Sequence, residues 1–181
     1  KHFVQYLVKG GNFLNCVCLV EQNDWTNEDW SEKGDISELK HTFSDWHPEI
    51  QNILESTKPD SLYKWGLHDR APMNKWSKGR FSLLGDAAHP MLPFVAQGAA
   101  MAIEDGIVLA SSLSSFDSIE LGLIDYENKR KFRTAKAQKT ASRNAIIFHL
   151  SDFYAPFRNL VMKFFIKKTM DSFYKYDAIS K

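Results

Sequence analysis

The sequence predicts an α+β fold, in which short strands dominate the first half and long helices the second. Residues 3–20 and 61–84 contain short runs rich in aromatic and branched side chains, which is typical of strands. Residues 98–113 and 119–150 are longer stretches of small and helix-favouring residues, which is typical of helices. A polar segment with two helical patterns separates the two strand regions.

The first strands are predicted to form a β-hairpin. Residues 3–8 alternate in polarity, residues 13–20 form a second apolar run, and the intervening Gly-Gly-Asn is a turn signal. Cys16 and Cys18 lie two positions apart on the second strand. They share a face there and are not expected to form a disulfide with each other.

A polar loop and two short helices are expected after the hairpin. Residues 21–33 combine acidic residues and asparagines with two tryptophans, as in a solvent-exposed loop with aromatic anchors. Residues 35–46 and 48–56 are helical patterns. Asp35 can cap the first helix, and Pro48 suits the first turn of the second.

A strand over residues 61–67 and a turn over residues 74–79 are predicted next. Arg70 follows the strand and could pair with a bound ligand. It could equally form a structural salt bridge with Asp69, and the sequence leaves both interpretations open.

The centre of the chain is a strand–turn–loop–helix unit. Residues 80–84 predict a buried strand, Gly85-Asp86 ends it, and a loop with two prolines follows. From Gly98 onward, small residues predict a helix whose first turn offers bare N–H groups and the positive end of the helix dipole. This arrangement suits a ligand with a polyol and an anionic part. An ordinary strand-to-helix connection is the alternative.

Two helical segments complete the chain. Residues 119–150 predict a long helix with a basic stripe, which is interpreted as a solvated face, or alternatively as a docking surface. The stripe consists of Lys129, Arg133, Lys136, Lys139 and Arg143. Residues 151–176 predict a helix whose apolar positions recur at three and four, which favours packing on the core over lying on a membrane surface.

The composition bounds the function. The chain has 181 residues, 44% of them hydrophobic and 25% charged, which is ordinary for a globular protein. Its net charge of +1 favours neither nucleic acid nor membrane as a partner. The charge is uneven, since residues 1–60 are acidic and residues 61–181 are basic. There is no metal-ligand spacing and no stable membrane insertion is expected, so a reducing, cytoplasmic setting is predicted.

The central unit also resembles a known motif. Residues 84–90 read Leu-Gly-Asp-Ala-Ala-His-Pro, and residues 96–105 read Ala-Gln-Gly-Ala-Ala-Met-Ala-Ile-Glu-Asp. With Pro93, they resemble the second flavin-binding motif of the single-component (group A) FAD-dependent aromatic hydroxylases, in the branch of salicylate hydroxylase and 3-hydroxybenzoate 6-hydroxylase. Further similarities follow the same order along the chain: Trp65, Asp69-Arg70 and Pro72 before the motif, and Tyr126-Glu127, Arg130, Arg133 and residues 173–177 after it.

The resemblance also implies what the sequence lacks. The family begins with a Rossmann half that carries Gly-x-Gly-x-x-Gly, and no such pattern occurs here. The chain is therefore similar to a C-terminal half whose partner would be the missing N-terminal FAD-binding half. Three parts are expected: residues 1–72 as the end of a substrate-binding sheet domain with a helical insertion, 73–118 as the flavin-facing segment, and 119–181 as C-terminal helices.

The resemblance implies a monooxygenase activity. Such an enzyme uses FAD, O₂ and NADH or NADPH to hydroxylate a small phenolic or aromatic acid through a flavin C4a-hydroperoxide. The isolated half is not expected to be active alone. The alternative is a flavin-free remnant or interaction module that uses the basic helix face.

The resemblance further implies roles for individual residues. Asp86, next to Gly85, would bind the ribityl chain, and the N–H groups of Gly98, Ala99 and Ala100 would face the pyrimidine edge of the flavin. Pro93 would lie near both flavin and substrate, Arg70 would contact the cofactor, and Tyr6 would face the substrate or simply complete its sheet. His89 is interpreted as structural, and no catalytic base is assigned.

Overall fold

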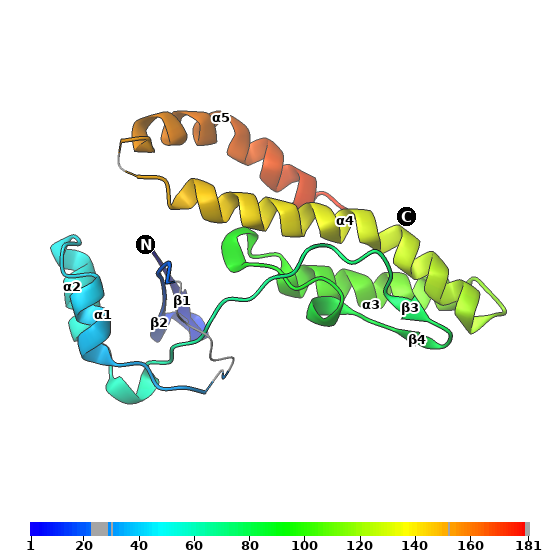
Figure 1. Ribbon diagram of the computed structural model, residues 1–181, viewed down its shortest axis with the longest axis horizontal. Coiled ribbons are helices and arrows are strands. Elements are labelled where there is room, and N and C mark those ends of the chain that lie inside the picture. The colour runs from blue at the N-terminus through cyan, green and yellow to red at the C-terminus, as the bar shows by residue number, and fades with distance from the viewer. Residues whose placement is uncertain (23–28, 30, 152, 180–181) are drawn as a thin grey trace. The chain divides into compact units, whose positions relative to one another are not determined.

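The computed structural model describes residues 1–22, 29, 31–151 and 153–179, and the chain forms two compact units (Figure 1). One unit comprises Lys1–Val20 and His68–Lys181, and the other comprises Glu21–Leu67. The two tryptophans of the predicted loop, Trp25 and Trp30, lie outside the described residues.

The larger unit begins with the predicted hairpin. Strands β1 (His2–Val8) and β2 (Phe13–Leu19) pair in antiparallel register, with Tyr6 opposite Asn15. The connection contains Gly10 and Gly11, whose φ angles of 65° and 90° fall in the region that glycine adopts without strain. The glycine pair therefore explains the tight return of the chain.

Both cysteines of β2 are free, as expected from their shared face. Burial, with a smaller contribution from Cys16, raises the pKa of the Cys18 thiol to about 11. Since the thiolate is the reactive form, Cys18 is a poor nucleophile at neutral pH.

An aromatic cluster anchors the start of the hairpin. The ring of His2 lies 5.2 Å from that of Phe94 and 5.9 Å from that of Phe148. Nδ1 of His2 also lies 2.7 Å from Nε2 of His149. Burial and the neighbouring His149 lower the pKa of His2, with a further contribution from the N-terminal ammonium.

Two long helices form the centre of this unit. Helix α3 (Gly98–Ser114) and helix α4 (Ile119–Phe148) lie side by side (Figure 1). Ser118 caps α4, because its hydroxyl oxygen accepts from the amide of Leu121. Both helices were predicted within two residues of their observed ends. Two small hydrophobic clusters combine residues of both helices with residues of neighbouring segments: Trp76–Ala88–Val108–Tyr126 and Met101–Ala137–Phe173.

The strand predicted before the central turn is shorter and more exposed than expected. Strands β3 (Ser77–Lys78) and β4 (Phe81–Ser82) form a two-residue pairing, and Phe81 is 82% exposed. The prediction of a buried strand over residues 80–84 is therefore wrong for this structure, because no further strand among the described residues covers its apolar side chains. Part of the turn predicted over residues 74–79 belongs to β3.

Helix α5 (Ala155–Tyr174) runs back along α4 (Figure 1). Of its described residues only Phe173 is buried, whereas Phe157 and Phe164 are each 70% exposed. The prediction that this helix packs on the core is therefore wrong for the described residues, since its apolar positions surround the helix instead of forming one stripe. No helix in the described parts of the chain is long and apolar enough to cross a membrane.

The basic stripe of α4 is not uniformly solvated. Arg133 is nearly buried, with a side chain 10% exposed, because it faces Glu104 of α3. Lys129 pairs with Asp125 at 2.8 Å on the helix surface. Because 3.6 residues make one turn, a stripe at spacings of three and four drifts around the helix, which brings Arg133 against α3.

The smaller unit contains two short helices. Helix α1 (Ile36–Thr42) is capped by Asp35, which accepts from the amides of Ser37 and Glu38, and helix α2 (Pro48–Glu55) begins at Pro48 as expected. Phe43 and Leu54 are fully buried between them. The strand predicted over residues 61–67 is wrong, since only an isolated bridge between Lys33 and Tyr63 forms there.

Candidate functional site

The site is built on a tight turn at residues 85–87. Gly85 is buried with φ +60°, and its carbonyl accepts from the amides of Ala88 and His89 at 2.9 Å each. A Cβ at this position would lie 3.3 Å from the Cβ of Ala102. Both the backbone angle and the close approach of α3 therefore require a glycine.

The turn presents Asp86 at the start of helix α3. Asp86 is exposed, and its Oδ1 lies 3.9 Å from the position that a Cβ on Gly98 would occupy. Within the described structure, no hydrogen bond uses the amides of Gly98, Ala99 or Ala100, and no side chain caps the helix. A carboxylate thus lies beside a helix start whose donors are free, and the absence of a Cβ on Gly98 leaves room there for a ligand.

A strained backbone position precedes this helix start. Ala96 has φ +51°, in the left-handed region that residues with a Cβ seldom occupy. Its amide donates to the carbonyl of Pro93 at 3.1 Å, at the end of a 3₁₀ turn over Pro93–Val95. Such strain is typical of functional sites, where surrounding contacts hold an unfavourable conformation.

Arg70 binds the backbone of the turn. Its Nη2 donates to the carbonyl of Ala87 at 2.8 Å and approaches that of Ala88 at 3.4 Å. Asp69 instead accepts from the hydroxyl of Ser142 at 3.0 Å. The salt bridge between Arg70 and Asp69, one of the two predicted alternatives, is therefore not formed.

Gln138 of α4 forms hydrogen bonds with the segment that carries Arg70 and with the proline loop. Its Nε2 donates to the carbonyl of Arg70 at 3.0 Å and to the carbonyl of Pro90 at 2.9 Å. The proline loop and the segment that carries Arg70 are thereby held against the same helix. A buried amide with two acceptors in place fixes loop positions without adding charge.

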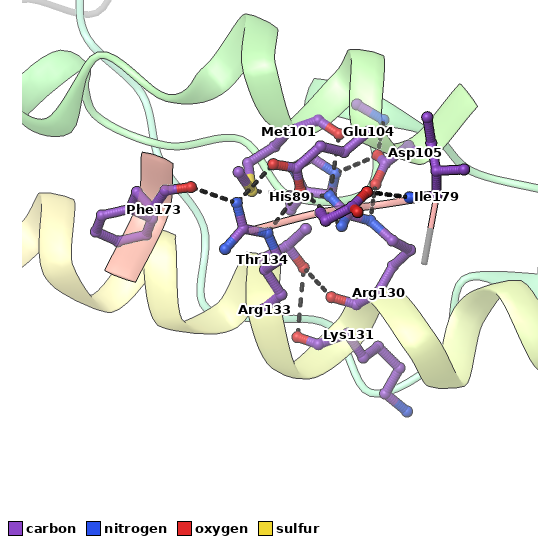
Figure 2. A network of polar contacts seen from close by, with 12 residues as sticks. His89, Met101, Glu104, Asp105, Arg130, Lys131, Arg133, Thr134, Phe173 and Ile179 are labelled. Atoms are coloured by element: carbon purple, nitrogen blue, oxygen red, sulfur yellow. Dashed lines mark hydrogen bonds and ion pairs between the residues drawn. The ribbon is translucent and has the colours of Figure 1, made fainter. Parts of the chain in front are cut away.

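A buried ion network lies behind the turn (Figure 2). Oδ1 of Asp105 accepts from Nε of Arg130 at 2.6 Å, and its Oδ2 lies 2.6 Å from Nε2 of His89. The same Oδ2 accepts from the amide of Gly85 at 3.1 Å. The side chains of Asp105, His89 and Arg130 are fully buried. The carboxylate thus serves three donors from three segments of the chain.

The network continues to the end of the chain. Glu104 forms ion pairs with two arginines. Its Oε2 lies 2.8 Å from Nη1 of Arg130, and its Oε1 lies 2.5 Å from Nη2 of Arg133. Arg133 also donates to the carbonyl of Phe173 at 3.1 Å, and its guanidinium lies 3.8 Å from the ring centre of Tyr176. The terminal segment is therefore attached to the helix pair that carries the turn.

The environment keeps Asp105 ionised. Burial disfavours the charged form, but hydrogen bonds from His89, Arg130 and the Gly85 amide outweigh burial and lower the pKa of Asp105. Burial lowers the pKa of Arg130, but the hydrogen bonds and negative charges of Asp105 and Glu104 outweigh burial and raise it. Because an ionised carboxylate can only accept, Nε2 of His89 is the donor to Asp105. Nδ1 of His89 has no hydrogen-bond partner among the described residues.

Most of the predicted site residues come together in the structure. Gly85 and Asp86 form the turn, Gly98, Ala99 and Ala100 begin the adjacent helix, Pro93 lies in the intervening loop, and Arg70 binds the turn. Tyr6 is half-exposed on β1, and within the described structure no hydrogen bond or ring contact joins it to these residues.

Asp105 and Ala96 were not among the residues predicted for the site. A signal for Asp105 was present, because the buried positions of α3 recur at four, three and four residues and include this one charged residue. Nothing in the sequence marks the strained angle of Ala96. Among the described residues there is no cluster of histidine, cysteine and acidic side chains that could hold a metal ion.

An acceptor at a turn beside a free helix start has the chemistry that suits a ligand with polyol and anionic parts. In a comparison with known proteins, residues 12–141 match the family described as FAD binding domain. The chain belongs to this family, that of the group A FAD-dependent aromatic hydroxylases.

Several relatives are similar over most of this chain. It is 40% identical to 6-hydroxynicotinate 3-monooxygenase of Pseudomonas fluorescens over 148 residues, covering 80% of this chain and 38% of the relative. It is 33% identical to 3-hydroxybenzoate 6-hydroxylase of Klebsiella oxytoca, covering 96% of this chain and 43% of the relative. The chain thus spans about two fifths of the length of these proteins.

Solved structures are also similar to most of this chain, which covers less than half of each of them. HpxO of Klebsiella pneumoniae, complexed with FAD and uric acid, is 27% identical with a TM-score of 0.68, covering 76% of this chain and 37% of that one. A salicylate hydroxylase in a substrate complex has a TM-score of 0.75 over 98% of this chain and 45% of that one, at 23% identity. The second likeness concerns the fold alone.

Proposed function

We propose that this chain is the C-terminal, flavin-facing half of an aromatic hydroxylase that uses FAD, O₂ and NADH or NADPH. Its substrate would be a small phenolic or aromatic acid. The observation that carries the proposal is the exposed carboxylate of Asp86 beside the free amides of Gly98, Ala99 and Ala100. In this proposal residues 1–72 end the substrate domain, 73–118 face the flavin and 119–181 form the C-terminal helices.

The residues present fit a flavin. Asp86 would accept hydrogen bonds from the ribityl hydroxyls, which it can do because it has no hydrogen bond or ion pair with a described residue. The amides that begin α3 would hold the pyrimidine edge and stabilise negative charge there through fixed dipoles. When bound, FAD supplies the redox chemistry with O₂; the protein supplies orientation and electrostatics.

Three further residues would shape the same site. Arg70 would hold the turn through the carbonyls of Ala87 and Ala88, and its remaining N–H groups could reach the cofactor. Exposed Pro93 would border both flavin and substrate, and Tyr6 would contribute to the substrate side from β1. The free cysteines are compatible with the proposed cytoplasmic setting.

Flavin binding tests this function. The purified chain would be mixed with FAD alone, and then together with the corresponding N-terminal portion of 6-hydroxynicotinate 3-monooxygenase. We expect weak or no binding alone, and a shifted flavin spectrum with quenched fluorescence in the mixture. Asp86→Ala should weaken binding roughly 10- to 100-fold, the range expected for a charged hydrogen-bond acceptor.

Asp117→Ala is the matched control, because Asp117 is exposed in the connection between α3 and α4, at the other end of α3 from this turn. It should bind FAD as the unaltered chain does. Unchanged FAD spectra in both the single-component and the mixed experiment would contradict the proposed function.

A second candidate function is an interaction module without flavin. Helices α4 and α5 border a groove of about 680 Å³ that contains four basic residues and two phenylalanines. Its basic residues are Lys136, Lys139, Arg143 and Lys168. No described residue forms an ion pair with these four side chains, so charge complementarity favours an acidic segment of a partner protein.

An acidic peptide tests this second candidate. A fluorescent oligoglutamate should bind at low salt and be released as the salt concentration rises. Changing Lys136, Lys139 and Arg143 to glutamine should abolish that binding, whereas the same change at exposed Lys58, Lys75 and Lys78 should not. Equal effects of the two triple changes would indicate nonspecific attraction and contradict the module.

A further inference from the structure

The backbone of the turn is held by one buried carboxylate. Asp105 lies about two turns after the start of α3, and its Oδ2 accepts a hydrogen bond from the Gly85 amide at 3.1 Å. The Gly85 carbonyl accepts hydrogen bonds from the amides of Ala88 and His89. Gly85 is therefore held on both its donor and its acceptor side, and the next residue is Asp86.

Helix α3 contacts this turn at two places. Asp105 binds Gly85, and Gly98, at the start of the same helix, lies beside the carboxylate of Asp86. The two contacts are separated by seven residues, about two helical turns. Because one rigid helix makes both contacts, the placement of Asp86 against the helix start depends on the hold of Asp105 on Gly85.

We propose that Asp105 is a positioning residue for the cofactor, holding Gly85 so that Asp86 and the start of α3 face the same ligand. The proposal rests on the proposed flavin site. Asp105 does not touch the ligand, because it is fully buried behind the turn. It acts through the Gly85 amide, while Arg130 and His89 hold its carboxylate in place.

The chemistry of an amide substitution isolates this role. In Asp105→Asn one of the two oxygens becomes an NH₂ group, which donates and cannot accept through its nitrogen. The remaining oxygen is expected to stay with the charged guanidinium of Arg130, the stronger partner. His89 can exchange its tautomer and accept from the new NH₂ group, whereas the backbone amide of Gly85 can only donate. Gly85 is thus the partner that loses its acceptor.

Glu104→Gln is the matched control. Glu104 is the neighbouring residue, and it also binds Arg130 and Arg133. It makes no hydrogen bond to Gly85 in the described structure. The control therefore disturbs the same arginines and removes the same charge without touching the turn.

Amide hydrogen exchange of the 181-residue chain gives the first measurement. We expect the Gly85 amide to be protected in the unaltered chain and to exchange at least tenfold faster in Asp105→Asn. The amide of Met101, which donates to the carbonyl of Gln97 at the start of α3, serves as reference for the stability of the helix. In Glu104→Gln the exchange of Gly85 should change only in proportion to that of Met101.

FAD affinity gives the second measurement, in the mixture with the N-terminal portion described above. Asp105→Asn should weaken FAD binding at least tenfold, and Glu104→Gln should change it less than threefold. An equal loss in both variants would assign Asp105 a structural role only and overturn the proposal. An unprotected Gly85 amide in the unaltered chain would overturn it too, even if Asp105→Asn did not fold.

The two measurements separate this inference from the proposed function. If the unaltered chain bound no FAD in the mixture, the proposed function would fail, and a role toward the cofactor would fail with it. The exchange rates of Gly85 would still establish whether Asp105 holds the turn. If FAD bound but Asp105→Asn bound it equally well, only the positioning role would be overturned.

Discussion

Nε of Arg130 lies 2.6 Å from Oδ1 of Asp105, and both side chains are fully buried. This pair joins α4 to α3 at the level of the turn, and Glu104 joins the same guanidinium at 2.8 Å. A buried pair of this kind adds little net stability over an apolar pair, but loss of one partner leaves an uncompensated charge.

Replacing Arg130 by methionine should lower the free energy of unfolding by about 3–5 kcal/mol, because Asp105 then remains buried without its cation. Urea denaturation measures the change. Arg80→Met is the control, since Arg80 is exposed and lies 4.0 Å from Glu120 at the surface, where ion pairs contribute little. A similar small effect of both substitutions would contradict the importance of the buried network.

Replacing Gly85 by alanine should destabilise the chain by about 1–2 kcal/mol, because its φ of +60° disfavours a Cβ. The new methyl group would also crowd Ala102. Gly106→Ala is the counterpart within α3, where a Cβ meets no atom within 4 Å. That change should stabilise the helix by roughly 0.5–1 kcal/mol. Thermal unfolding of both variants checks the two signs, and destabilisation by Gly106→Ala would refute this comparison.

The attachment of the β1–β2 hairpin through His2 should weaken as the pH falls below the ordinary histidine pKa of about 6.5. Burial and His149 lower the pKa of His2 in the folded state, so the detached hairpin binds the proton more readily. The contribution of neutral His2 to the attachment is therefore complete above pH of about 6.5. It is lost as the pH falls through the lowered pKa of His2 in the folded state.

Amide exchange of β1 between pH 7.5 and pH 5 measures this detachment. Residues of β1 should exchange faster at low pH, after correction for the intrinsic pH dependence of exchange. In His2→Gln the corrected rates should no longer depend on pH in this interval. A pH dependence that persists in the variant would assign the effect to another group.

The exposed phenylalanines of α5 should cause the isolated chain to self-associate at micromolar concentrations, because large exposed apolar patches favour association. Combined change of Phe157, Phe164 and Phe165 to serine should weaken self-association at least tenfold in sedimentation equilibrium. These residues are 70%, 70% and 61% exposed. The same change at Lys163, Lys167 and Lys175 should not weaken it, and a monomeric unaltered chain would contradict the prediction.

The helices were largely predictable because their signals are local. Small residues from Gly98 onward predicted α3, and Asp35 caps α1 as predicted. The strands were less predictable, because a strand depends on a partner that the sequence does not specify. Residues 61–67 have the composition of a strand, yet only the bridge at Tyr63 forms.

The exposed part of the candidate site was predictable and its support was not. The Gly85-Asp86 turn and the start of α3 are close in sequence, separated only by the proline loop, so their residue types indicated their surroundings. The contacts of Asp105 depend on Arg130, which lies 25 positions further along, and on how two helices pack. The ion pair of Arg133 with Glu104 likewise depends on how α4 packs against α3. From the sequence, the basic stripe of α4 suggested a solvated face instead.

The contacts of the buried network also bear on folding kinetics. His89, Gly85 and Arg130 lie only 16, 20 and 25 residues from Asp105 along the chain. Contacts over short loops form rapidly, since closing a short loop costs less entropy. We therefore expect the helical hairpin to assemble early, within one continuous stretch of about 45 residues. Chain segments outside this stretch would then pack against a helix α3 that is already fixed relative to the Gly85 turn.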